Sequence, residues 1–336
     1  HTAYRRQRQM CIRDRYKIED GVLTLGGGTI SEYSPYPWLA DSVRGTIHTV
    51  IISGKIILKD DAARYFFKGL SNTTKIDGIH NLDTSEVTDM DSMFEGDSTL
   101  TRLDLSNFNT SNALNMRSMF AGLSSITALD VSNLNIDKAG FLGMSNLFAG
   151  DTSLVLLNLS FDTRGFIKSA ETGPSKIPAF QSMLSALTNL TVLILSPNTL
   201  FKADESFVGN PNLGSPAGST NWRAVAADRG GTLSNPKGLS YSPTDLIALY
   251  HVDNASHPTK TEIWVPENGI NDQSAISAQP TYSIPVGTKF DPSTVFISLT
   301  TLDKQIITNY QDALKAGMTV SGDQFDTNNT GTHTVT

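Results

Sequence analysis

The residues best suited to chemistry form a periodic column of acids, an amide and serines. At one position of a repeated phrase stand two acids and an amide: Asp104, Asp130 and Asn158. Serines stand two residues later in each copy and form a second column: Ser106, Ser132, Ser160 and Ser196. On parallel strands about 4.8 Å apart, neighbouring carboxylates repel by roughly a few tenths to 1 kcal/mol in water. Some partner must therefore offset this repulsion.

Three kinds of partner are open. Serine hydroxyls and backbone N–H groups are one, because residues in phase with a repeat usually serve the repeat. A weak Ca²⁺ or ligand strip is the second, because hard cations prefer carboxylate oxygens. A glycosidase pair is the third, although it needs one carboxyl with a raised pKa in a cleft, and a ladder of equivalent acids offers no such asymmetry.

Other catalytic signatures are missing from the sequence, so we predict that the protein is not an enzyme and holds no cofactor. It contains no His pair at metal-binding spacing, no nucleophile elbow and no Cys–His pair. The glycines at 26–28 lack the Lys-Ser/Thr of a phosphate loop. A net charge of −7 argues against nucleic acid as a partner. The sequence contains no run of 18 apolar residues, so we expect no membrane span within it.

The elements that must position this column belong to an internal repeat. Met93–Gly96 returns as Met119–Gly122 and as Leu147–Gly150, with Phe-to-Phe spacings of 26 and 28. The phrase Leu-x-x-Leu-x-Leu recurs between these marks and predicts a short strand. We expect its middle residues to align in adjacent parallel strands: Leu103, Leu129, Leu157 and Leu193.

The other half of each unit has helical spacing. Val87, Met90, Met93 and Phe94 fall at i, i+3, i+6 and i+7, and residues 83–85 stand ahead as N-cap candidates. One strand plus one helix cannot bury its own apolar face and must stack on neighbours. The pattern predicts an α/β leucine-rich-repeat solenoid with a concave parallel sheet.

The phrases at 82–94 and 100–111 resemble the BspA-like leucine-rich-repeat surface proteins of bacteria, of the lactobacillus type. The resemblance implies an extracellular, wall-attached, Gram-positive protein, with a signal peptide and anchor outside this sequence. Phe108 and Leu134 replace the usual Asn after the strand, so we expect an apolar stack there instead of an asparagine ladder.

The resemblance also implies function. We expect an adhesin, a monomer whose concave face contacts a host or matrix protein or a glycan through Arg102, Asp104, Ser106, Asp130, Ser132, Asn158 and Ser160. The alternatives are a passive spacer within a larger wall-anchored protein and, as a minor one, a carbohydrate-active hydrolase.

The sequence divides into five segments. Residues 1–15 carry five arginines and the only cysteine, and we interpret them as a non-native segment, the alternative being a basic tail. An N-terminal cap with a hairpin at 46–58 and a helix at 62–67 is expected over 16–70, repeats over 71–200 and a C-terminal cap over 201–265. Residues 266–336 resemble a bacterial Ig-like stalk domain, and we expect an incomplete sandwich.

Overall fold

The computed structural model describes residues 16–139, 143–165, 167, 180–201, 210–251 and 253–270, and three short strands between residues 275 and 307. The chain forms two compact units, His1–Ile270 and Asn271–Thr336, and each is described by itself. Among the described residues, no helix has the length and apolar character needed to cross a membrane.

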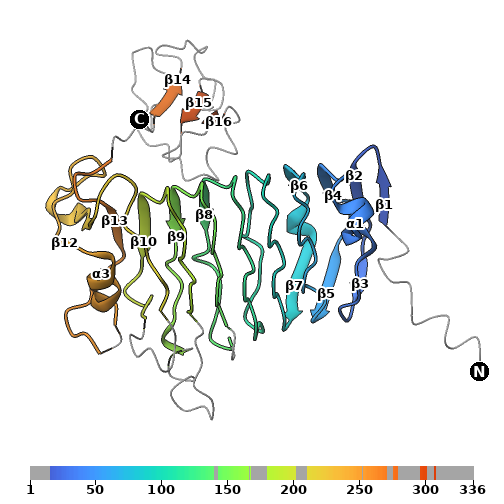
Figure 1. Ribbon diagram of the computed structural model, residues 1–336, viewed down its shortest axis with the longest axis horizontal. Helices are drawn as coiled ribbons and strands as arrows, with labels where there is room; N and C mark the ends of the chain where they lie inside the picture. Colours follow the sequence, from blue (N-terminus) through green and yellow to red (C-terminus); the bar gives the residue numbers. More distant parts are fainter. Residues whose placement is uncertain are drawn as a thin grey trace, which may run out of the picture. The chain divides into compact units, whose positions relative to one another are not determined.

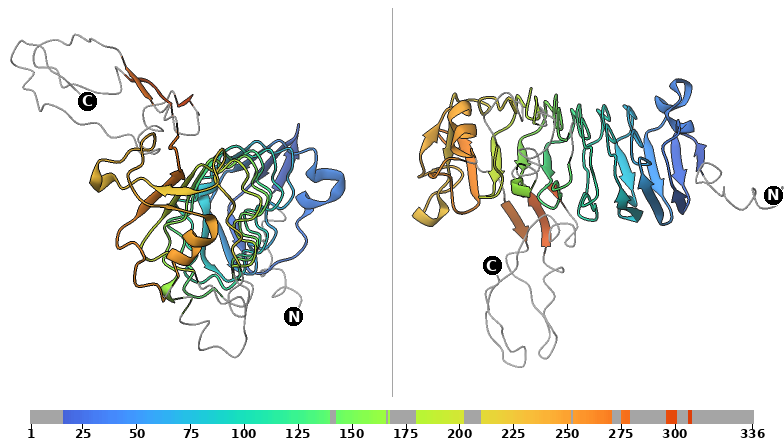
Figure 2. Two further views of the ribbon diagram at one scale, coloured as in Figure 1. Left: turned by 60° about the vertical axis from the view of Figure 1, so that its left-hand side comes forward. Right: turned by 90° about the horizontal axis from the view of Figure 1, so that it is seen from below.

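The first unit is a solenoid whose successive turns lie side by side (Figure 1). One row of strands contains two sheets, in the orders β1-β2-β4-β6 and β12-β11-β13-β10-β9-β8, and a second row has the order β3-β5-β7. Seen from its end, the turns lie behind one another (Figure 2). The strands of the first row are β1 (Tyr16–Glu19), β2 (Val22–Leu25), β4 (Thr49–Ile52), β6 (Lys75–Asp77), β8 (Ala128–Asp130), β9 (Leu156–Asn158), β10 (Val192–Leu195), β11 (Trp222–Ala224), β12 (Ser240–Tyr241) and β13 (Glu262–Pro266), and those of the second are β3 (Gly28–Ile30), β5 (Ile56–Asp60) and β7 (Leu82–Val87).

Parallel strands in each row pair with their equivalents one repeat later. Leu129 pairs with Leu157, and Leu157 pairs with Leu193, so the predicted alignment is confirmed for these three residues. Leu103 is partly buried against the core, although it lies outside the named strands. The repeat solenoid that the sequence predicted is therefore present.

Parallel pairing already begins at β2, which pairs with β4 inside the segment assigned to the N-terminal cap. The hairpin predicted at 46–58 is wrong, because β4 and β5 lie in different sheets and each pairs in parallel with neighbouring turns. The Ser53–Gly54 pair instead makes a corner, where the Ser53 N–H donates to Leu25 O at 2.9 Å.

The third side of the solenoid is not helical, which corrects the predicted α/β character. The segments around the Met-Phe-x-Gly marks are successive turns, and residues 62–67 likewise form turns and not a helix. Ser92 and Gly96 have φ of 56° and 78°, and Ser118 and Gly122 have 52° and 77°. A right-handed helix requires negative φ, so a left-handed residue at every fourth position excludes it.

Backbone hydrogen bonds on this third side run to the next repeat. The N–H groups of Ser92, Phe94 and Gly96 donate to carbonyls 25 residues later, at 2.8, 2.9 and 2.8 Å. The residues between them bond within their own turn, as Met93 N–H does to Met90 O at 3.2 Å. These three-residue turns bury apolar residues at helix-like spacing, which explains why the sequence pattern predicted a helix.

The core is one column of apolar side chains with an aromatic stack along it. The rings of Phe67, Phe94, Phe120 and Phe148 stack face to face, with centroids 5.5, 6.0 and 5.7 Å apart. All four side chains are buried. Trp38 stacks on Tyr36 at 4.7 Å near the first turns, so aromatic residues also cover the N-terminal end of the column.

The corner after each first-row strand differs from the prediction in one respect. Phe108 and Leu134 are buried, as expected. An asparagine ladder nevertheless exists one residue earlier, where Asn133 Nδ2 donates to Leu105 O at 2.8 Å. Asn81 makes the equivalent bond two repeats before, to Ile52 O at 2.9 Å. The asparagine side-chain amides therefore donate to backbone carbonyls of the preceding turn, one residue before the apolar stack.

The C-terminal end is closed by strands of opposite direction. β13 pairs antiparallel with β10 and with β11, which ends the parallel ladder of this sheet. Trp222 and Trp264 are buried and pack in this end of the core. Helix α3 (Pro243–Leu249) begins with an N-cap, in which the Ser242 hydroxyl accepts from the Asp245 N–H at 3.1 Å. The remaining short elements are η3 (Pro37–Leu39), α1 (Asp41–Arg44), η4 (Ile79–Asn81) and η5 (Ala227–Arg229).

The second unit contains a three-stranded antiparallel sheet in the order β14-β15-β16. Its strands are β14 (Ala275–Ala278), β15 (Phe296–Thr300) and β16 (Ile306–Ile307). Antiparallel pairing is compatible with a sandwich, but the described residues provide one sheet and no second sheet to face it. The motifs that suggested an Ig-like domain, at 282–288, 319–322 and 331–336, and residues 1–15 lie outside the described residues.

Two buried acids each tie consecutive turns together. Asp97 Oδ1 accepts the N–H of Leu70 at 2.8 Å, and Asp151 Oδ1 accepts that of Leu123 at 2.8 Å. Both side chains are 1% exposed, and each Oδ2 is buried without a hydrogen-bond partner among the described residues. Burial raises the pKa of both carboxyls well above the usual value, against the opposing effect of the backbone N–H bonds.

We predict that replacing Phe120 by Ala lowers the free energy of unfolding by about 3–5 kcal/mol, because it opens a cavity inside the ring stack. Urea unfolding followed by circular dichroism measures the change. Leu114→Ala is the control, since this side chain is 50% exposed and its loss should cost less than about 0.5 kcal/mol. Equal losses in the two variants would contradict the buried stack.

We predict that the two buried acids make the solenoid less stable as pH rises. A folded-state pKa above the unfolded value stabilises the fold below about pH 4 and loses that contribution as pH rises through the folded value. Asp97→Asn with Asp151→Asn should therefore raise stability at pH 8 relative to the parent protein and change it least at pH 4. Urea unfolding at both pH values, with exposed Asp130→Asn as control, measures this. A double variant that is destabilised at pH 8 contradicts it.

Candidate functional site

The predicted site residues lie along one flank of the solenoid. Asp130 in β8 pairs with Asn158 in β9, so these two side chains are neighbours on adjacent turns. The residues before them, Leu129 and Leu157, are buried, and strand alternation therefore directs Asp130 and Asn158 outward. The next position along this column is Ile194, so the polar column ends at β10.

These acids and amides close corners of the solenoid. The side-chain Oδ1 atoms of Asp104, Asp130 and Asn158 accept the N–H two residues later, at 2.9, 2.9 and 3.2 Å. The Ser132 hydroxyl also donates to Asp130 Oδ1, at 2.7 Å. Such Asx turns replace a missing backbone partner. Backbone hydrogen bonding is thus present at all three positions, and the serine hydroxyl bond is present at Asp130.

The same pattern of hydrogen bonds occurs on the second side of the solenoid, at Asp83 and Asn109. Asp83 Oδ1 accepts from the Ser85 N–H at 3.1 Å and from its hydroxyl at 2.6 Å, and these bonds with Lys55 lower the pKa of Asp83 to about 2. Asn109 makes the corresponding bonds to Ser111. Residues 83–85, expected as a helix N-cap, instead lie within strand β7, where the ladder to β5 is irregular. Asx turns are a property of the frame and do not by themselves mark a ligand site.

The flank still offers exposed groups. Arg102, Asp104, Ser106, Asp130 and Ser132 are exposed. In contrast, the hydroxyl oxygen of Ser160 is buried, and Ser196 is 9% exposed and bonded to Thr199. The strip of exposed polar side chains on the flank therefore becomes narrower towards β9 and β10. In the described part of the chain, no group of three or more His, Cys, Asp or Glu side chains is arranged to hold a metal ion.

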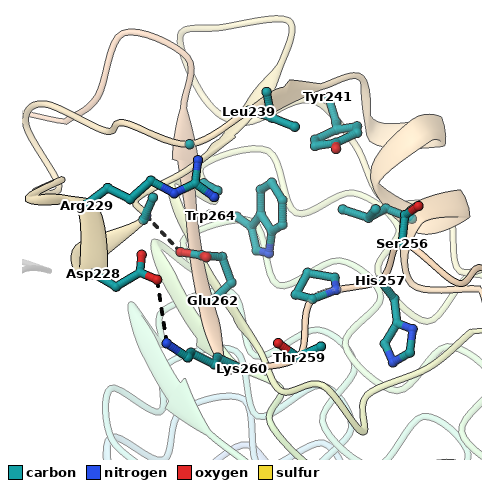
Figure 3. A pocket seen from close by; sticks show the side chains of 15 residues that line it. Asp228, Arg229, Leu239, Tyr241, Ser256, His257, Thr259, Lys260, Glu262 and Trp264 are labelled. Atoms are coloured by element: carbon teal, nitrogen blue, oxygen red, sulfur yellow. Dashed lines mark hydrogen bonds and ion pairs between the residues drawn. The ribbon is translucent and has the colours of Figure 1, made fainter.

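A pocket of about 400 Å³ lies in the C-terminal cap (Figure 3). We call it the cap pocket. One wall is apolar and the opposite one is charged, as Figure 3 shows. Residues 224–264 supply every lining side chain, so the cap alone builds it. The apolar wall comprises Leu239, Tyr241, Leu249 and Trp264, and the polar lining includes Asp228, Arg229, Ser256, His257, Thr259, Lys260 and Glu262.

Some charged side chains of the cap pocket have an ion-pair or hydrogen-bond partner, and others have none among the described residues. Lys260 Nζ lies 3.6 Å from Asp228 Oδ2, and Glu262 Oε1 accepts the N–H of Ala226 at 2.9 Å. Arg229 is exposed and forms no ion pair with any residue that the structure describes. His257 Nδ1 lies 2.9 Å from Asn254 O, so this nitrogen carries the proton of the neutral ring and its Nε2 is an acceptor.

The pocket's frame is held by close backbone contacts. Ala226 has a left-handed φ of 52°, which is uncommon for a residue with a side chain. A Cβ at Gly238 would lie 2.4 Å from the Ala224 Cβ, so only glycine fits there. Trp264 Nε1 donates to the Tyr250 hydroxyl at 3.1 Å and is fixed in the wall. The sequence analysis missed this pocket because its residues come from separate segments of the cap without a motif.

Comparison with known proteins gives one match. Residues 62–186 match a family described as "Mycoplasma protein of unknown function, DUF285", which covers less than half of the chain. The matched region begins before Phe67, the first ring of the stack, and includes all three Met-Phe-x-Gly marks. No curated protein matches the chain. No solved structure matches it either.

We predict that Asp130→Ala lowers the free energy of unfolding by about 1–2 kcal/mol, because it leaves the Ser132 N–H and hydroxyl without their acceptor. Asp130→Asn keeps Oδ1 as an acceptor and should cost less than about 0.5 kcal/mol. Thermal unfolding of both variants measures the difference. If the Asn variant loses as much stability as the Ala variant, the negative charge and not the Asx turn is what the corner requires.

Proposed function

We propose that this chain is the binding part of an extracellular bacterial surface protein, and that the flank of its solenoid contacts a host or matrix protein or a glycan. The observation that carries the proposal is the flank itself, where exposed Arg102, Asp104, Asp130 and Ser132 stand on successive turns of one rigid frame. Solenoids use such extended surfaces for binding.

The flank combines both signs of charge on a fixed spacing. Arg102 is exposed and forms no ion pair with a described residue, and Lys75 pairs with Asp77 at 2.8 Å one turn earlier. The Asx turns fix the side chains of Asp104 and Asp130, so less conformational entropy is lost when a partner binds them. A partner with a repeated, mixed-charge or hydroxyl-rich surface would complement this arrangement.

One similarity supports the surface location. The repeated phrases resemble those of BspA-like surface proteins, and the family that matches residues 62–186 is of unknown function but covers this same repeat region. The Gram-positive origin, the wall anchor and the Ig-like stalk are further parts of the proposal. The finer leucine-rich-repeat assignment is also part of the proposal, although the third side has turns in place of the predicted helix.

A passive spacer is the second candidate, and ion pairs between turns favour it. Lys55 lies 2.9 Å from Asp83, Lys59 lies 2.8 Å from Glu86, and Lys68 lies 2.8 Å from Glu95. Each pair joins consecutive turns and stiffens the stack, although exposed pairs contribute only about 0–1 kcal/mol each. A spacer needs stiffness and no particular flank.

A carbohydrate-active hydrolase and a weak Ca²⁺ strip along the flank are minor alternatives. Either would use the carboxylates of Asp104 and Asp130, and one oxygen of each is already engaged in an Asx turn. The binding surface and the spacer are therefore the two functions that we favour.

We predict that Arg102→Glu combined with Asp130→Lys weakens binding of the full chain to immobilised matrix proteins or glycans by about tenfold or more, because both reversed charges oppose the partner. Surface plasmon resonance measures the affinity. Arg117→Glu is the matched control, since Arg117 is exposed on another side of the solenoid. Equal affinities of all variants, each still folded at the assay temperature, would favour the spacer.

A further inference from the structure

We propose that the cap pocket binds a small organic carboxylate with an apolar body. This site is separate from the flank, so it stands whether or not the flank is an adhesive surface. The proposal rests on the volume of the pocket, on its apolar wall, and on which of its charged side chains already have a partner.

The first argument is the size of the cavity and the way it is built. A volume of about 400 Å³ falls within the range of about 300–1,000 Å³ usual for small-molecule sites. The left-handed Ala226 and the tight Gly238 contact fix two of its walls before any ligand arrives. A preformed site loses less entropy on binding.

The second argument is the apolar wall. Leu239 is 66% exposed at the pocket, and Tyr241 lies beside it in Figure 3. Trp264 stands behind them, with its indole nitrogen already bonded to the Tyr250 hydroxyl. Its polar atom is therefore satisfied, and the wall presents carbon to an incoming group. An apolar ligand body would remove the exposed part of Leu239 from water.

The third argument is charge. Asp228 is next to Lys260, and Glu262 already accepts a backbone N–H, so both acids of the lining are engaged. Arg229 is the lining cation without an ion-pair partner among the described residues, and Figure 3 shows its guanidinium directed over the pocket. A planar guanidinium can bind a carboxylate through two parallel hydrogen bonds.

These contacts distinguish between ligand classes. A cationic ligand would have to compete with Lys260 for Asp228 or with the Ala226 N–H for Glu262, and it would approach Arg229 unfavourably. A neutral ligand would leave the guanidinium without a partner. A carboxylate meets Arg229 directly, while its apolar body lies on Leu239 and Tyr241.

Isothermal titration calorimetry of the full chain tests the proposal with three ligands of one shape: 4-phenylbutanoate, 4-phenylbutanamide and 4-phenylbutylamine. We expect the carboxylate to bind at least about tenfold more tightly than the other two, as a charge-assisted pair requires. Arg229→Gln should remove that preference. Leu239→Ser should weaken binding of the carboxylate while retaining its preference over the amide.

Lys237→Gln is the matched control, because Lys237 is an exposed cation of the same cap segment but does not line the pocket. It should leave all affinities unchanged. The proposal is overturned if the amine or the amide binds as tightly as the carboxylate, if Arg229→Gln retains the preference, or if millimolar carboxylate produces no binding. Near-ultraviolet circular dichroism establishes that each variant is folded.

Discussion

The structure depends on hydrogen bonding between equivalent residues of successive turns. Every buried backbone N–H and C=O needs a partner, and on each side of the solenoid many of these partners lie one repeat away. The strand rows satisfy them through parallel ladders, as between β8 and β9. The third side satisfies them through alternate N–H groups, such as that of Phe94 to Met119 O at 2.9 Å. The ring stack, the Asx corners and the asparagine bonds all follow from this one register.

Much of the fold could be predicted because apolar residues recur at fixed positions of each repeat. Leu129, Leu157 and Leu193 align as their spacing required. The helix could not be excluded from the pattern, because three-residue turns bury Met90 and Met93 at the same spacing as a helix does. The deciding signal was small: a residue able to adopt positive φ recurs four positions before each marked glycine. That signal specifies backbone conformation, whereas apolar periodicity specifies only which face is buried.

The site was less accessible to sequence reasoning. The exposed column at Asp104 and Asp130 could be found because it shares the period of the repeat, and hydrogen bonding within the chain, one of the three explanations, is present there. The cap pocket has no period. Arg229, Leu239 and Glu262 approach one another only because antiparallel strands close the end of the solenoid. In a repeat fold, a surface that follows the repeat can thus be predicted from the sequence, whereas a site in the non-repetitive cap cannot.

Hydrogen-bond scalar couplings between amide nitrogens and carbonyl carbons test the inter-turn register most directly. In a deuterated, isotope-labelled sample, the account predicts cross peaks from the Phe94 nitrogen to the Met119 carbonyl carbon and from the Phe120 nitrogen to the Leu147 carbonyl carbon. A helical third side would instead connect Phe94 with Met90, four residues earlier. Observation of that local connection in place of the inter-turn one would contradict the account.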